Sequence, residues 1–350
     1  MKYIIISLFA SLLFFSCIST NVVLVDFKEP AEVTFRPDVV NVVVVDNTYM
    51  PKRESDSVSV ETNAFLKAYF PDSAQIKFTE YLAKYMKEEN YFNDVIYYPH
   101  IREEYDSLYV SLKKKEIEEI CIETGADALI SVDRCMIWGV LEDMSLFIPG
   151  NFVLSVSTLA ILRTYNSDGR AAAFPFLFSD TLYWEGSVPG SGVNYLYKLP
   201  TISDAIDEAV SSAADKLTNL YIPHWQTSER LYYSDNSSEM KQAAVHVGKS
   251  EWNVAAFIWG EKYGKEEKPE KKARLASNIA LANECLDDVD NALVWNEIAL
   301  EWMQEVNNPV LSEQIVHQKT VLTQRKSQKA KLKRQYGEDE SDSDLGGLDK

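Results

Sequence analysis

The hydrophobic periodicity of this chain changes once, at about residue 225, and this change restricts the folds that the chain can adopt. Upstream, β-branched runs such as 22–27 and 39–47 alternate with segments whose apolar residues recur every three or four positions. Such alternation is typical of strands and amphipathic helices. Downstream, only the helical period remains. A chain of 350 residues is long enough for two domains of these kinds.

The segment 39–225 is predicted to be an α/β domain. Its order is strand, helix, strand and helix, then a run of strands, then a closing helix. The apolar run Val42–Val45 indicates a strand that is covered on both faces. This order predicts the α+β class, with helices packed on a mixed β-sheet. The preceding stretch, 17–38, is expected to contribute a first strand.

Alanines recur at fixed intervals in the last third of the chain. Their positions are Ala244, Ala256, Ala280, Ala292 and Ala299. The first two are 12 residues apart, and the last three are separated by 12 and 7 residues. Small residues at these intervals resemble the packing positions of tetratricopeptide repeats, in which two helices cross closely. The sequence therefore predicts an all-α, tetratricopeptide-like domain; an unrelated pair of helical hairpins is the alternative.

Composition sets the boundaries of this helical domain. Residues 226–240 are polar and rich in turn formers, so they are expected to be a linker. The helical domain itself is expected over 241–325. The final segment, 326–350, is charged and contains few apolar residues, so it is predicted to be a disordered tail.

The amino-terminal segment resembles a targeting signal. Residues 3–15 are apolar or small without interruption, which suits a secretory signal and is too short to span a bilayer. Phe14, Ser16 and Cys17 resemble the lipobox of bacterial lipoproteins. This resemblance implies removal of a signal peptide, 1–16, and a diacylglycerol on Cys17 that anchors the protein to a membrane. The alternative is an uncleaved signal in which Cys17 is merely apolar.

The residues after the cysteine indicate an orientation. In lipoproteins of Bacteroidota-type bacteria, acidic residues directly after the cysteine often accompany export to the cell surface. No charge follows Cys17 before Asp26. We therefore expect a protein of the bacterial cell envelope that faces the periplasm, with the choice between inner and outer membrane left open.

The formal net charge of −18 limits the partners. Such acidity disfavours binding to nucleic acid through bulk electrostatics. Besides Cys17, the chain contains Cys121, Cys135 and Cys285. These three match neither a disulfide framework nor a zinc spacing, so we expect small buried hydrophobic residues. Oxidation of one pair in the periplasm is left open.

No motif of known chemistry is present. The sequence lacks HExxH, a Walker A motif, GxSxG and a GxGxxG after a strand. The histidines are scattered: His100, His224, His246 and His317. Asp127 and Asp133 share one face of a strand, most simply as a structural pair at its edge. We therefore predict no catalytic residue, no metal site and no cofactor.

Two wider resemblances support this organisation. The segment TGADALISVDR, 124–134, is similar to a strand entry in the amino-terminal part of the Tol-system propeller protein and in curli-secretion lipoproteins. The chain from Cys17 to about Gln324 resembles a family of uncharacterised lipoproteins common in Bacteroidota-type gut bacteria. This resemblance implies the domain organisation and the envelope location, and it implies no catalytic residues.

Together these features predict a membrane-anchored periplasmic lipoprotein that acts as a protein- or peptide-binding or assembly module of the envelope. The helical repeats are expected to hold the partner. The alternative is an envelope hydrolase or glycan-processing enzyme with an unrecognised site. A groove lined by acids with perturbed pKa values would favour the enzyme, whereas an aromatic or amide-lined surface would favour the binding module. The sequence identifies neither the partner nor the oligomeric state.

Overall fold

The computed structural model divides the chain into two compact units. The described residues are 19–48, 57–63, 66–71, 74–99, 111–144, 147, 150–187 and 199–338. The helical unit comprises residues 1–30, 224–334 and 338–350, and the sheet unit comprises residues 31–223 and 335–337. The expected fold class, an α+β part followed by an all-helical region, is confirmed.

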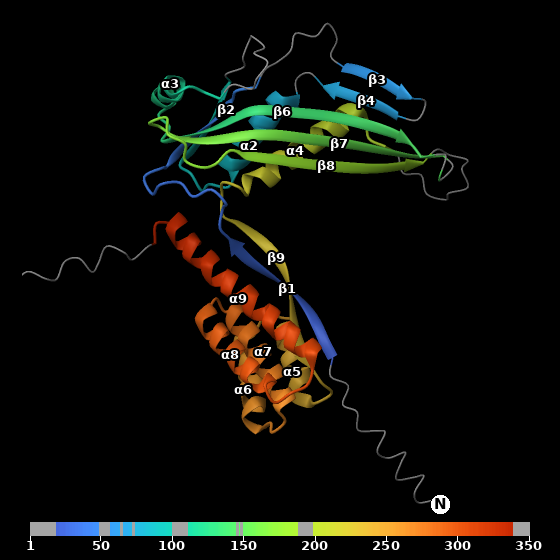
Figure 1. Cartoon of the computed structure of the whole chain (residues 1–350), viewed down its shortest axis with the longest axis vertical. Helices are drawn as coiled ribbons and strands as arrows, with labels where there is room; N and C mark the ends of the chain where they lie inside the picture. Colours follow the sequence, from blue (N-terminus) through green and yellow to red (C-terminus); the bar gives the residue numbers. More distant parts are fainter. Residues whose placement is uncertain are drawn as a thin grey trace, which may run out of the picture. The chain divides into compact units, whose positions relative to one another are not determined.

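The sheet unit is built on a mixed sheet of seven strands (Figure 1). The strands are β2 (Asn41–Asp46), β3 (Ser57–Asn63), β4 (Leu66–Pro71), β5 (Asp94–Pro99), β6 (Ala128–Asp143), β7 (Asn151–Asn166) and β8 (Phe176–Ser187). Strand β2 pairs in parallel with β5 and with the first part of β6. The second part of β6 pairs antiparallel with β4, and β7 pairs antiparallel with β6 and β8. Strand β8 is therefore an edge strand.

Helices cover the two faces of this sheet unequally. On one face, α2 (Ala74–Glu88) and α4 (Ile202–Thr218) enclose the main core (Figure 1). On the other face, α3 (Lys114–Thr124) packs against β2, β5 and the start of β6. The run Val42–Val45 lies between these layers and is fully buried, as a strand covered on both faces requires.

The helical unit combines five helices with a two-stranded ribbon in the described part of the chain. The helices are α5 (Ser238–Val247), α6 (Trp252–Lys265), α7 (Pro269–Cys285), α8 (Val289–Met303) and α9 (Pro309–Gln335). The ribbon consists of β1 (Ser19–Glu29) and β9 (His224–Ser234), which pair antiparallel over their full lengths (Figure 1). Among the described residues, no helix is both long enough and apolar enough to cross a membrane.

Two segments are more ordered than their composition suggested. The stretch 226–240, expected to be a linker, contains most of β9 and the start of α5, because a ribbon with one outward face needs few apolar residues. The segment from 326, expected to be disordered, continues α9 through Gln335. Two of its lysines, Lys326 and Lys329, have carboxylate partners on α8 and the loop before it, 2.7 Å away in each case. Residues 339–350 lie outside the described residues.

Candidate functional site

Small residues lie where the helices of the helical unit cross. Ala280 and Ala292 are fully buried where α7 and α8 meet Leu322 of α9. Ala299 is fully buried in the neighbouring cluster, against Ala276 of α7. These alanines therefore occupy positions at which a larger side chain would separate the helices.

In the pair formed by α5 and α6, the most buried positions are shifted by one residue. Ala243 and Ala255 are fully buried, whereas Ala244 and Ala256 are half-buried. The buried pair has the same interval of 12 residues as the pair that the sequence singled out. The interval of 12 residues alone therefore does not tell whether Ala244 and Ala256 or Ala243 and Ala255 are the packing positions.

An asparagine of α7 holds the backbone of β9. The N–H of Tyr233 donates to Oδ1 of Asn278, and Nδ2 of Asn278 donates to the C=O of Tyr233, both at 2.7 Å. Because one strand residue directs both backbone groups to the same side, those of Tyr233 point away from β1. Asn278 is fully buried, so its amide takes the place of a neighbouring strand at this edge.

A charged cluster fixes the middle of the ribbon to the helices. Arg230 of β9 donates to both carboxylate oxygens of Glu284 at 2.8–3.1 Å. The guanidinium groups of Arg230 and Arg325 each lie 4.8 Å from the ring centroid of Phe27. Arg325 also donates to the C=O of Lys28 at 2.6 Å. Because Glu284 is buried, loss of Arg230 would leave a buried charge without its closest partner.

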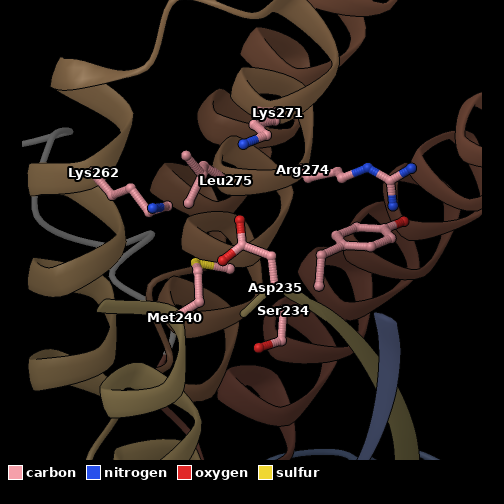
Figure 2. Close-up of a pocket in the computed structure, with 8 residues that line it drawn as sticks. Ser234, Asp235, Met240, Lys262, Lys271, Arg274 and Leu275 are labelled. Atoms are coloured by element: carbon pink, nitrogen blue, oxygen red, sulfur yellow. The ribbon is translucent and has the colours of Figure 1, made fainter. Parts of the chain in front are cut away.

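A small, open pocket lies where β9 ends (Figure 2). Lys262 of α6 and Lys271 of α7 line it, and Figure 2 shows the carboxylate of Asp235 pointing into the space beside them. Burial opposes the ionisation of Asp235. Hydrogen bonds from Ser237 and the charges of the two lysines outweigh this effect and lower the pKa of Asp235.

The charges around this pocket are already paired. The pairs are Lys262 with Glu239 at 3.9 Å, Lys271 with Glu266 at 3.8 Å and Arg274 with Glu270 at 2.6 Å. With Asp235 added, carboxylates outnumber cations, so an incoming anion would gain little. The enclosed space of about 20 Å³ has room for about one water molecule. The pocket therefore serves to hold the end of β9 rather than a ligand.

The outer edge of β1 is open. Tyr233 lies opposite Thr20, and its backbone N–H and C=O point away from β1, so this pair is not hydrogen-bonded and the backbone groups of Thr20 point away from β9. Because the direction alternates along a strand, the backbone groups of all even-numbered residues of β1 point away from β9. The hydrogen bond from Arg325 to the C=O of Lys28 agrees with this assignment. Between Thr20 and Asp26, no hydrogen bond from the described residues reaches the outward backbone groups. An extended chain can therefore add to this edge.

The ribbon also exposes apolar side chains. Val22 and Leu24 are 58% and 65% exposed, and Leu231, which pairs with Val22, is 39% exposed. The alternate residues Val23 and Val25 pack against the helical core. The inner face of the ribbon is therefore occupied, and its outer face is available to a partner.

Comparison with family models agrees with the composite nature of the chain. The domain of unknown function DUF8603 matches residues 39–233, more than half of the chain. The chain belongs to this family. The domain of unknown function DUF6340 matches residues 241–337, which contain most of α5 and all of the helices from α6 to α9. The expected membership of an uncharacterised family is thus confirmed at this level. A comparison with curated proteins found no match.

The carboxylates that the sequence singled out in the DUF8603 region do not converge. Asp127 accepts a hydrogen bond from the N–H of Asn41 at 2.9 Å, where β2 begins. Asp133 lies further along β6, accepts a hydrogen bond from Asn47 at 2.8 Å and is paired with Arg163. Six residue-to-residue steps along the strand place the two ~20 Å apart. The carboxylate pairs of glycoside hydrolases are ~5–10 Å apart, so these two do not form such a pair.

Sequence reasoning also overlooked a buried carboxyl group in the sheet unit. Asp46 ends β2, and its Oδ1 accepts hydrogen bonds from Thr48, whereas its Oδ2 has no hydrogen-bond partner among the described residues. Burial raises the pKa of Asp46. The run Val42–Val45 followed directly by an aspartate was the available signal, since parallel strands of α/β sheets carry sites at their carboxyl ends. Among the described residues, no group of acidic, histidine and cysteine side chains could hold a metal ion.

The cysteines lie in or beside the cores. Cys121 is buried, Cys135 and Cys285 are half-buried, and all three are free thiols. Burial raises the pKa of each thiol, that of Cys121 to about 11. These thiols therefore stay protonated at neutral pH and react poorly. Cys17, the signal 1–16 and His100 lie outside the described residues.

Proposed function

We propose that this protein is a lipid-anchored protein of the bacterial cell envelope that binds a partner protein at the β1–β9 ribbon. One observation carries the proposal: no described residue bonds to the outward backbone groups of β1 between Thr20 and Asp26, and Val22 and Leu24 are exposed on the outer face of the ribbon. An extended segment can add to such an edge as a third strand. Backbone hydrogen bonds then supply affinity, and contacts of alternate side chains supply specificity.

This proposal changes the role of the helices. The sequence alone suggested that the repeats themselves grip a peptide. The surface of α7 already holds an extended segment of the same chain, because Asn278 binds the backbone of Tyr233. The helices therefore act as a platform, and the ribbon that they hold is the surface offered to the partner.

The anchor belongs to the same proposal. Phe14, Ser16 and Cys17 resemble a lipobox, and β1 begins at Ser19. A diacylglycerol on Cys17 would hold the ribbon close to the membrane surface, facing the periplasm in a Bacteroidota-type cell. Mass spectrometry of the mature amino terminus should find an acylated cysteine, and Cys17→Ala should release the protein from the membrane. A free thiol on the mature wild-type chain would contradict the anchor.

Site-specific photo-crosslinking of the full-length protein in its native membrane tests the binding surface. A photoreactive residue is placed at Leu24, and the matched control is placed at Val294, which is 56% exposed on α8. We expect one protein to be crosslinked from Leu24 and absent from the adducts of Val294. Leu24→Pro, which removes an outward N–H, should weaken capture of that protein at a neighbouring probe on Val22. Equal adducts at both probe positions, or none from Leu24, would contradict the proposal.

A further inference from the structure

The sheet unit has an open edge of its own. The N–H of Met144 donates to the C=O of Asn151, so this is a hydrogen-bonded pair of the β6–β7 ladder. Hydrogen-bonded and non-hydrogen-bonded pairs alternate along an antiparallel ladder. The odd-numbered residues of β7, like Asn151, therefore direct their backbone groups toward β6, and the even-numbered residues direct theirs toward β8. At the other end of β7, the hydrogen bond from the N–H of Ala172 to the C=O of Thr164 gives the same assignment. The odd-numbered residues of Leu177–Glu185 thus direct theirs outward from β8.

This edge lacks the features that usually protect an edge strand. Strand β8 contains no lysine, arginine or proline. Its one central charge, Asp180, is paired with Lys216 of α4 at 2.7 Å and so lies on the helix-covered face. No hydrogen bond from the described residues reaches the outward backbone groups of Leu177–Glu185. Apart from Glu185 at its end, the outward residues of this edge carry no charge, and such an edge is a template for another strand.

The sheet face beside this edge also exposes apolar side chains in the described part of the chain. Leu177 pairs with Ile161, and Met136 pairs with Leu159 on the same face. Leu177 is 63% exposed, and Met136 is 40% exposed. The described helix on this side, α3, packs against β2, β5, the start of β6 and Tyr165 near the end of β7, and neither Leu177 nor Met136 belongs to that cluster. Apolar surface that continues to a free edge marks an interaction site.

We propose that β8 pairs antiparallel with β8 of a second copy of this chain, about a two-fold axis at Thr181. In this register every outward residue meets an outward residue: Leu177 faces the partner's Glu185, and Ser179 faces the partner's Tyr183. The five outward residues would form about ten hydrogen bonds, since each hydrogen-bonded pair exchanges two. Moving the axis to Ser179 or Tyr183 shortens the overlap and loses pairs.

Charge favours this self-pairing. Asp180 faces the partner's Leu182, and Glu185 faces the partner's Leu177, so no carboxylates oppose one another. An axis at Asp180 would bring two aspartates face to face, which destabilises an antiparallel pair. The two-fold axis also joins the apolar faces beside Leu177 in both copies into one surface. A second copy therefore satisfies the edge and its adjoining face together.

Disulfide trapping of the full-length protein in its membrane tests the register. In the proposed pair the two Cα atoms at residue 181 are ~5.5 Å apart, within the range that a disulfide spans. Thr181→Cys should give a covalent dimer on mild oxidation. Tyr183→Cys is the matched control, because its two copies would be ~14 Å apart. We expect at least tenfold more dimer from Thr181→Cys; the absence of dimer from it, or equal yields, would overturn the proposal.

Two further variants separate pairing from folding. The double variant Ser179→Cys with Tyr183→Cys places cysteines opposite each other across the axis, so it should restore the dimer that Tyr183→Cys alone lacks. Ser179→Pro removes an outward N–H and leaves the hydrogen bonds to β7 in place, whereas Ser179→Ala keeps the N–H. Mass measurement after extraction in mild detergent should find monomer for Ser179→Pro and dimer for Ser179→Ala. A Ser179→Pro dimer would overturn the proposal.

Discussion

Replacing Asn278 with alanine tests whether the helical unit is organised around its ribbon. The change removes both hydrogen bonds to Tyr233 and leaves a buried N–H and a buried C=O without partners. Each orphaned group costs ~1–3 kcal/mol, so the expected loss is about 2–6 kcal/mol. Domains are stable by only ~5–15 kcal/mol, so this loss is large enough to detach β9 or to unfold the helical unit.

The assay is amide hydrogen exchange in the full-length protein, read at Tyr233 and along β1. A loss of ~2 kcal/mol should speed exchange of these amides about 30-fold. Asn283→Ala is the matched control: this asparagine is also on α7, but its Nδ2 donates to the C=O of Ile279 within the same helix. Unchanged protection at Tyr233 in Asn278→Ala, or the same acceleration in the control, would refute the role of this amide.

Ala292→Leu should overpack the junction of α7, α8 and α9 and cost ~1–3 kcal/mol in urea unfolding. Val294→Leu, at an exposed position of the same helix, should change stability by less than about 0.5 kcal/mol; equal effects would remove the crossing assignment. Because burial raises the pKa of Asp46, the contribution of this carboxyl group to stability should fall as pH rises from ~3.9 through the folded-state pKa. Asp46→Asn should lose less stability over that window, and parallel pH profiles would contradict this.

The sequence predicted the local elements better than their partners. The α+β class and the helical region follow from periodicity, which is a local property. The pairing of β1 with β9 joins residues about 200 positions apart, and no local pattern encodes it. The stretch after Trp225 has few apolar residues, as a linker would, because only one face of the ribbon packs against the helices. Its turn-forming residues, 234–238, do connect β9 to α5. The surface on which the proposed function rests therefore could not be predicted from the sequence, because it is formed by long-range pairing.

Buried polar groups were the second source of error in the candidate site. Asn278 and Glu284 lie in a helix whose sequence reads as alanine-rich and apolar, and the pattern assigns them no partners. Their partners are on the ribbon: the amide of Asn278 bonds the backbone of Tyr233, and the carboxylate of Glu284 bonds Arg230. Without these partners both polar groups would be buried and unsatisfied. A buried amide or carboxylate on a small-residue helix is therefore a signal for an unrecognised neighbour.

The topology explains how one chain holds both units. Strand β1 belongs to the helical unit. The chain then passes through the whole sheet unit, residues 31–223, and returns to the helical unit with β9, which pairs with β1. Glu29 and His224 are paired at the end of the ribbon, so the chain leaves and re-enters the helical unit at one place. Within the sheet unit, the N–H of Val33 donates to the C=O of Leu220, which keeps its two ends together as well. Insertions whose ends lie close together disturb the host least. The DUF8603 match ends within β9, at residue 233, so the match includes most of the strand through which the insertion is closed.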